Sequence, residues 1–279
     1  MTSAGLNTSK DYALCYHDMG FSVFVLQNPD SEGRTIQQLK ARKKPAVNWE
    51  LYQIMRPSKI QLDRWFAKNP NYNVGIVTGS ISKIVALDVD GPTAGKQVEE
   101  ARMKMSTNLR IAFDHTMVNK TGSGGAHIIF RVEDDISDIS QKKLWTDGKP
   151  HSEIKLQGNG HYIVGAPSLH PDGDDKVYQW NGETPALITR QELNELIRLL
   201  GGGGSGTVSR LEGNFPPSNF EAPDQRPFTT EEMLRLFKWV KPLYIPGDRD
   251  AIILYLSGAM RKDAGFSHEA ARTFFKLLC

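Results

Sequence analysis

The chain has 279 residues, a nearly balanced net charge of +2 and only two cysteines, Cys15 and Cys279. A chain so close to neutral cannot attract nucleic acid through its overall field, so any such contact must come from local basic patches. Two cysteines at opposite ends of the sequence exclude a disulfide framework and a cysteine-rich zinc site, and they indicate a reducing compartment. Residues 1–10 lack the apolar core of a signal peptide, and no apolar run approaches the length of a bilayer span. We therefore expect a cytoplasmic protein with no membrane partner.

The amino-terminal part of the chain alternates between helical and strand patterns. The elements expected there are helices over residues 11–19 and 61–68 and strands over residues 21–26, 74–77 and 84–90. Ser9 is the expected N-cap of the first helix, which ends at Gly20, and Ser58 is the expected N-cap of the second. Trp65 and Phe66 have helical spacing with the other apolar residues of that helix, so we expect them in the core.

The strand over residues 84–90 ends in two acids, Asp88 and Asp90. Side chains alternate along a strand, so these two carboxylates share one face. They repel each other unless a cation lies between them. Gly91 and Pro92 stop the strand and leave both acids at an open edge. This segment alone is consistent with a metal site and equally with a plain strand that ends in an Asp-Gly turn.

Two later strands also carry polar groups beside glycines. Residues 122–125 form a glycine-rich loop that lets the backbone approach a ligand, and amides in such a loop can bind phosphate oxygens. His127 begins the strand that follows this loop, and Glu153 and Lys155 share one face of the next strand. Three carboxylates can hold two divalent cations, and a histidine and a lysine can contact a triphosphate. The pattern is typical of two-metal phosphoryl or nucleotidyl transfer.

The remaining elements complete one domain over residues 1–200. We expect a helix over residues 93–105, a β-rich run as far as Trp180 with an acidic turn at residues 172–175, and a closing helix over residues 188–200. Runs of strands with interspersed helices predict an α+β domain with a mixed or antiparallel sheet.

The composition changes after residue 200. Residues 201–227 read as a flexible linker rich in Gly and Pro, of natural or engineered origin. Residues 228–279 predict a small all-α helical bundle that begins with a capping box at Thr229 and Glu232. The last helix has no exit signal before Cys279, so we expect the module to be truncated at its carboxyl end.

The order of these motifs resembles the archaeo-eukaryotic primase superfamily. More narrowly, residues 10–200 are similar to the bifunctional primase-polymerase (Prim-Pol) domains of plasmids, phages and other mobile elements. Motif one falls on Asp88 and Asp90, motif two on residues 123–127, and motif three on Glu153, where relatives commonly have aspartate. Residues 228–279 resemble the small helical module that follows such domains, often before a helicase.

The resemblance implies a DNA primase and DNA-directed DNA polymerase that replicates a plasmid, phage or other mobile element. Asp88, Asp90 and Glu153 would be the catalytic residues and would hold two Mg²⁺ or Mn²⁺ ions. The residues implied for nucleotide binding are Ser123, Gly124, Gly125, His127, Lys155 and Ser168, and the basic residues that we expect at DNA are Lys43, Lys44, Lys142 and Lys143. The expected partners are a single-stranded DNA template, NTP or dNTP substrates, and a helicase domain or protein that follows this chain.

Two alternatives stay open at this point. Residues 87–91 also resemble the nucleophile loop of haloacid-dehalogenase-type phosphatases, in which Asp88 would be phosphorylated and Asp90 would act as acid and base. That alternative leaves the loop before His127 unexplained. The other alternative is a replication-origin DNA-binding module that keeps the fold without the chemistry.

Overall fold

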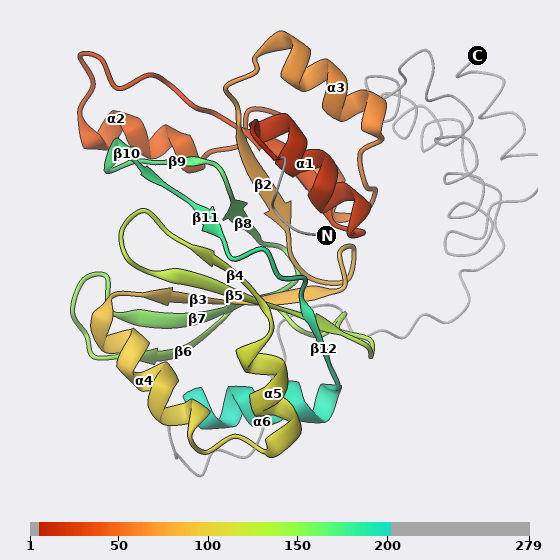
Figure 1. Ribbon diagram of the computed structural model, residues 1–279, viewed down its shortest axis with the longest axis vertical. Coiled ribbons are helices and arrows are strands. Elements are labelled where there is room, and N and C mark those ends of the chain that lie inside the picture. The colour runs from red at the N-terminus through yellow and green to blue at the C-terminus, as the bar shows by residue number, and fades with distance from the viewer. Residues whose placement is uncertain (1–5, 202–279) are drawn as a thin grey trace, which may run out of the picture. The chain divides into compact units, whose positions relative to one another are not determined.

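The computed structural model describes residues 6–201, which belong to the first of two compact units, Met1–Ser205 (Figure 1). The linker predicted over residues 201–227, apart from Gly201, and the helical module predicted over residues 228–279 lie outside the described residues.

The described residues form an α+β fold, as the sequence predicts. The helices are α1 (Ser9–Asp18), α2 (Ile36–Leu39), α3 (Lys59–Lys68), α4 (Pro92–Arg102), α5 (Thr107–Asp114) and α6 (Arg190–Leu200), with 3₁₀ turns η1 (Lys40–Lys43) and η2 (Glu50–Gln53). The strands are β1 (Ser22–Leu26), β2 (Asn73–Val77), β3 (Ile84–Asp90), β4 (Met117–Lys120), β5 (Ala126–Val132), β6 (Lys142–Thr146), β7 (Glu153–Gln157), β8 (Tyr162–Gly165), β9 (Leu169–His170), β10 (Gly173–Val177), β11 (Gln179–Trp180) and β12 (Ala186–Ile188).

The strands form two main sheets and a hairpin. The smaller sheet has the order β1-β2-β8 and is antiparallel. The larger sheet has the order β11-β4-β5-β3-β7-β6, also antiparallel, and β12 adds one parallel pairing to β5. β9 and β10 form the separate hairpin. The prediction of a mixed or antiparallel sheet is therefore confirmed.

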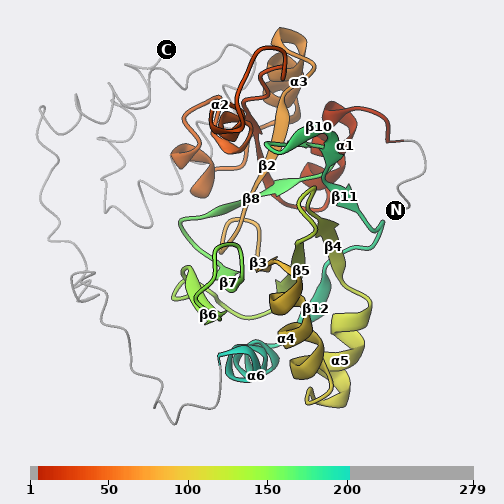
Figure 2. The same ribbon diagram turned by 90° about the vertical axis from the view of Figure 1, so that its left-hand side faces the viewer.

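Each sheet has its own helical layer. Figure 1 shows α1 and α3 beside the smaller sheet, and α4, α5 and α6 below the larger one. Figure 2, turned by 90°, shows α4, α5 and α6 again on the same side of the larger sheet. Since helices cover only one face of the larger sheet, its other face is turned toward the smaller sheet.

β3 separates the two hydrophobic cores of this fold. Val85, Leu87 and Val89 point into the core beneath α4 and α6, whereas Ile84 and Ala86 point into the core shared with the smaller sheet. The side chains that follow Ile84 and Ala86 on the same face are Asp88 and Asp90. One face of β3 thus changes from fully buried and apolar to partly exposed and acidic within four residues.

The helix boundaries follow local capping chemistry. Thr8, and not Ser9, is the N-cap of α1, because its hydroxyl accepts from the Asp11 amide while the Asp11 carboxylate accepts from Thr8 in return. Ser58 caps α3 as predicted. Thr189 caps α6, so the helix begins at Arg190 and the residues before it form β12 instead.

Of two predictions for helices, one needs correction and the other is confirmed. The helix predicted over residues 93–105 ends earlier, at Arg102, and α5 is a separate helix that the sequence did not reveal. Trp65 and Phe66 are buried in the core, which confirms their predicted role.

Candidate active site

The strand register brings the predicted site residues into two rows across the larger sheet. Asp88 on β3 is paired with His127 on β5 and with Lys155 on β7. Asp90, two residues further, is paired with Glu153 on β7. Paired residues of adjacent strands have their side chains on the same face, so all five groups lie on the face away from α4, α5 and α6. We call this surface, formed by Asp88, Asp90, His127, Glu153 and Lys155, the acidic face.

Asp88 lies between two nitrogen-bearing side chains. Its Oδ1 is 3.6 Å from Nε2 of His127, and its Oδ2 accepts a hydrogen bond of 3.2 Å from Nε2 of Gln157. About a third of the Asp88 side chain is exposed, so a cation or a substrate can reach the carboxylate.

His127 is held by its other ring nitrogen. Nδ1 donates to the Val164 carbonyl of the smaller sheet at 3.2 Å, which leaves Nε2 as the atom that faces Asp88. Burial lowers the pKa of His127 and nearby Lys43 lowers it too, whereas the Asp88 carboxylate acts in the opposite direction. Lys43 of η1, which we expect at DNA from the sequence, therefore lies within electrostatic range of His127.

Asp90 has a histidine partner that the sequence did not reveal. Nδ1 of His151 is 3.2 Å from Oδ2 of Asp90. His151 has a φ of 53°, in the left-handed region that non-glycine residues rarely adopt, and its carbonyl packs against Gly91. A Cβ at Gly91 would lie 2.2 Å from that carbonyl oxygen, so only glycine fits where β3 ends. No periodicity marks His151, because it lies in a loop.

Glu153 is paired with lysines in this structure. Lys155 donates to its Oε1, and Nζ of Lys143 is 2.9 Å from its Oε2. The hydrogen bond from Lys155, followed by that from Lys143, lowers the pKa of Glu153. Among residues 6–201, no three His, Cys, Asp or Glu side chains lie close enough together to hold a metal ion as they stand.

The glycine-rich loop forms a tight turn between β4 and β5. The Gly125 amide donates to the Thr121 hydroxyl at 3.0 Å, and the Gly124 amide donates to the Thr121 carbonyl at 3.1 Å. The Ser123 hydroxyl is 3.0 Å from that of Thr121. Two of the amides predicted to bind phosphate are thus used inside the turn, so side chains must supply most of any phosphate contact.

Ser168 has a structural position instead of one at the site. It is fully buried, and its hydroxyl accepts a 2.9 Å hydrogen bond from the Val74 amide of β2. The predicted nucleotide contact from this hydroxyl conflicts with that position, because the oxygen is committed to the backbone of the smaller sheet.

The four lysines proposed for DNA do not lie together. Lys143 is paired with Lys155, on the acidic face, whereas Lys142 is paired with Leu156, whose side chain belongs to the core beneath the helices. Lys43 and Lys44 are exposed near the hairpin β9–β10, but Lys43 alone affects the histidines of the site.

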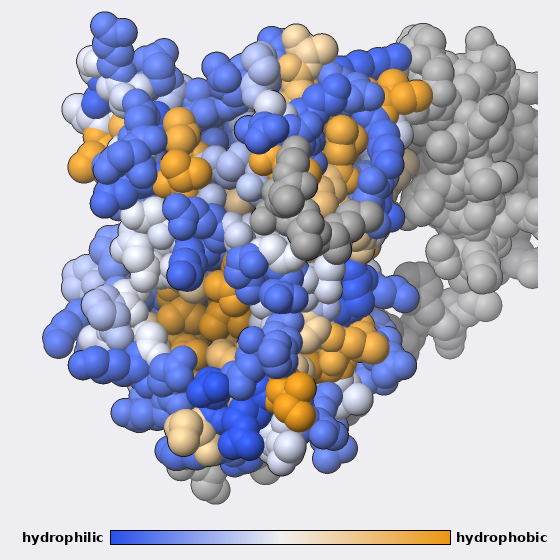
Figure 3. Space-filling view, viewed as in Figure 1, coloured by the Kyte–Doolittle hydropathy of each residue, from blue (hydrophilic) through white to orange (hydrophobic). Residues whose placement is uncertain are grey.

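A cavity of about 630 Å³ lies on the side of the glycine turn that faces away from Asp88 and Asp90. Its apolar wall includes Val89, Val98 and Ile128, which belong to the face that α4 covers. Figure 3 shows apolar side chains exposed in this part of the surface, between β4 and α4 of Figure 1. The cavity is therefore separate from the carboxylates, although residues 120–122 and 124–126 border it.

One residue near Asp88 was predictable from alternation alone. Gln157 lies two residues after Lys155 on β7, so it shares the acidic face. Tyr178 and His170 carried no such signal, because they reach the site only through the fold of the hairpin β9–β10 and the segment after it.

Within residues 6–201, no helix is long and apolar enough to cross a membrane.

Comparison with known proteins assigns the family. A search of curated proteins finds no match to this chain. The family model described as "Bifunctional DNA primase/polymerase, N-terminal" matches residues 13–196, which contain every residue of the acidic face described above. The chain therefore belongs to the Prim-Pol family of bifunctional DNA primase/polymerases, and this membership supports a primase or polymerase role in DNA replication.

Proposed function

We propose that this chain synthesises and extends DNA primers by two-metal nucleotidyl transfer on a single-stranded template, with the reacting groups in residues 6–201. The observation that carries this proposal is the row His127–Asp88–Lys155, with Asp90 and Glu153 beside it at the end of β3. Acidic groups that can hold cations are then flanked by basic groups that can bind phosphate.

The donor set fits Mg²⁺ or Mn²⁺. Asp88 and Asp90 supply only oxygen ligands, which hard divalent cations prefer, and both side chains are about one third exposed. Cations bound by these residues would lower the pKa of the attacking 3′-hydroxyl and stabilise the charge that develops on the transferred phosphoryl group.

Glu153 would join this set by exchanging partners. Its carboxylate lies opposite Asp90 but is held by Lys155 and Lys143. A triphosphate carries more negative charge than one carboxylate, so it would attract both lysines. Glu153 would then be free to turn toward Asp90. This exchange would couple nucleotide binding to assembly of the third carboxylate.

His127 would contact the incoming nucleotide through Nε2, since Nδ1 is committed to the Val164 carbonyl. Because Nδ1 keeps its proton, Nε2 donates to a phosphate oxygen only in the protonated ring, a form that the Asp88 carboxylate and the charge of the phosphate both favour. The hydrogen bond to the backbone fixes the plane of the ring and so orients Nε2 over the acidic face. His127 would therefore act on nucleotide affinity more than on template affinity.

The substrates proposed are NTPs or dNTPs, and the setting proposed is replication of a plasmid, phage or other mobile element. Both follow from the resemblance to Prim-Pol domains, as does a helicase that would act after this chain. Of the four lysines expected at DNA, Lys143 is the one that lies on the acidic face, where the exchange with Glu153 assigns it to phosphate groups of the incoming nucleotide.

The test is nucleotide incorporation by the full chain on single-stranded DNA with Mg²⁺ or Mn²⁺, with and without a primer. We expect Asp88→Asn and Asp90→Asn to abolish incorporation and to leave the unfolding temperature unchanged or slightly raised, because each change removes like-charge repulsion. Asp63→Asn is the control, since Asp63 is an exposed acid of α3 that pairs with Lys10. Near wild-type incorporation by either site variant would refute the proposal.

The same assay separates the alternatives. Template binding by the wild-type chain without incorporation at any metal concentration would favour the non-catalytic DNA-binding module. The antiparallel pairing of β3 with both of its neighbours argues against the phosphatase alternative, because that family usually has this strand in a parallel sheet.

A further inference from the structure

His170, at the end of β9, lies beside the catalytic face without having a role in the function proposed above. A Cβ added at Gly122 of the glycine turn would lie 2.8 Å from the His170 Cβ, so turn and histidine are in direct contact. The Tyr178 ring lies next to both histidines, with its centroid 5.7 Å from that of His170 and 5.8 Å from that of His127.

The ring of His170 carries an unused hydrogen-bonding atom. The Asp172 amide lies 3.3 Å from Nδ1, so Asp172 engages this ring nitrogen and Nε2 is the free one. The Asp172 carboxylate lies 3.3 Å from the same nitrogen. Nε2 is buried and has no hydrogen-bond partner among residues 6–201, and His170 as a whole is 96% buried, with 4% of its surface exposed. A buried polar atom without a partner is costly, so such atoms need an explanation.

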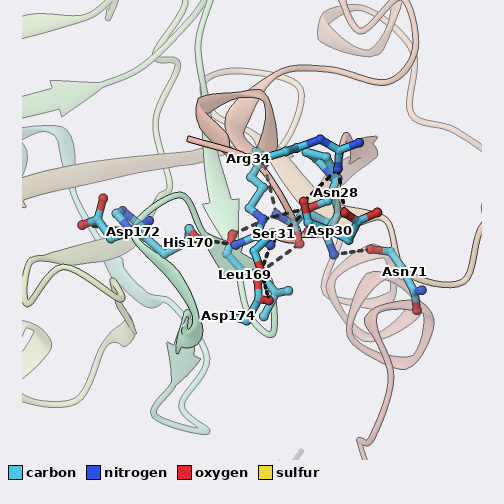
Figure 4. A network of polar contacts seen from close by, with 12 residues as sticks. Asn28, Asp30, Ser31, Arg34, Asn71, Leu169, His170, Asp172 and Asp174 are labelled. Atoms are coloured by element: carbon cyan, nitrogen blue, oxygen red, sulfur yellow. Dashed lines mark hydrogen bonds and ion pairs between the residues drawn. The ribbon is translucent and has the colours of Figure 1, made fainter. Parts of the chain in front are cut away.

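The backbone of this segment is held rigidly from several sides. Arg42 of η1 donates to the His170 carbonyl at 2.9 Å, and Asn73 exchanges two 2.9 Å hydrogen bonds with the backbone of Leu169. Figure 4 shows Leu169 and His170 within this polar network, with Asp172 beyond the ring. Arrangements of this kind position a side chain in advance of ligand binding.

Lys43 supplies a cation next to this histidine. Its side chain is exposed and forms no hydrogen bond or ion pair with residues 6–201, while Tyr162 donates to its carbonyl at 2.9 Å and so fixes its backbone. Lys43 follows Arg42, which donates to the His170 carbonyl, so its backbone lies in the same region as the ring. Burial, followed by the charge of Lys43, lowers the pKa of His170 to about 4, so the ring is neutral at neutral pH.

We propose that Lys43 and His170 Nε2 together bind a β- or γ-phosphate of the incoming nucleotide, as a second phosphate-binding element beside the glycine turn. The negative charge of the phosphate favours the protonated ring, in which Nε2 donates to a phosphate oxygen while the Nδ1 proton faces the Asp172 carboxylate. This inference rests on the proposed function, because it assumes that a nucleoside triphosphate is the substrate.

Calorimetric titration of the full chain with dATP and with dAMP tests the site without catalysis. His170→Met and His170→Gln are a matched pair of nearly equal size, of which only glutamine keeps a polar donor. Lys43→Met is matched by Lys44→Met at the neighbouring exposed position. We expect His170→Met and Lys43→Met to weaken dATP binding about tenfold. The matched variants His170→Gln and Lys44→Met should bind dATP within about threefold of wild type. None of the four variants should change dAMP binding.

Wild-type affinity of His170→Met and Lys43→Met for dATP would overturn the proposal. Equal losses for dATP and dAMP would also overturn it, since the site would then not contact the β- or γ-phosphate. If both His170 variants fail to fold, the comparison of Lys43→Met with Lys44→Met decides alone. A wild-type chain that binds dATP but never incorporates it would contradict the proposed function and leave this site intact.

Discussion

Replacing Arg42 by methionine should destabilise the domain more than any other single change near the site. Arg42 is fully buried. Its guanidinium donates to the Pro29 carbonyl through Nε and Nη2 at 3.2 and 3.1 Å, to the His170 carbonyl at 2.9 Å, and to the Asp174 carboxylate. One side chain thus joins η1 to the hairpin β9–β10.

The magnitude follows from the groups left behind. Two backbone carbonyls lose a charged donor, and a buried polar group left unpaired costs about 1–3 kcal/mol. Methionine fills much of the volume but satisfies neither carbonyl of Pro29 and His170, so we expect a loss of about 3–5 kcal/mol. For a domain of this size the unfolding temperature should fall by about 6–20 °C.

Thermal unfolding by circular dichroism measures this loss, and Arg34→Met is the control. Arg34 is an exposed arginine that pairs with Asp30 four residues earlier, so its removal should change the unfolding temperature by less than about 2 °C. An Arg42→Met variant that unfolds within 2 °C of wild type would show that the hairpin is not held by this guanidinium.

Three further predictions test the environments of other residues. Ser168→Ala should lower stability by about 1–3 kcal/mol, because the Val74 amide loses its acceptor in a fully buried site. The KM for nucleotide should not change, and a raised KM with unchanged stability would assign Ser168 to nucleotide binding after all. Lys143→Met should raise the KM for nucleotide or template several-fold, whereas Lys142→Met, on the opposite face, should leave both within error. The pKa of His170 is lowered to about 4 in the folded state, against about 6.5 in the unfolded chain. Between these two pH values the unfolded chain binds a proton that the folded chain does not bind, so stability is lost as the pH falls through this window. Stability measured between pH 4 and 6.5 should therefore rise by up to about 1.4 kcal/mol per pH unit in the metal-free wild type, and a His170→Gln variant with the same slope would contradict this assignment.

Local chemistry made much of the fold predictable. Alternation along a strand is a property of the backbone, so the shared face of Asp88 and Asp90 and that of Glu153 and Lys155 follow from position alone. Capping is equally local, and Ser58 caps its helix as expected. The first helix shows the limit of such reasoning, since Thr8 and Ser9 are both good caps and only the reciprocal bond from Asp11 decides between them.

The motif order along the sequence therefore determined the fold class, the family and the acidic face. Tertiary structure decided which strands are neighbours, and so put His127 and Lys155 on either side of Asp88. It also gave Glu153 its lysine partners and buried Ser168 against the smaller sheet. These outcomes depend on contacts between residues far apart in sequence, whose free energies local propensity and periodicity do not contain.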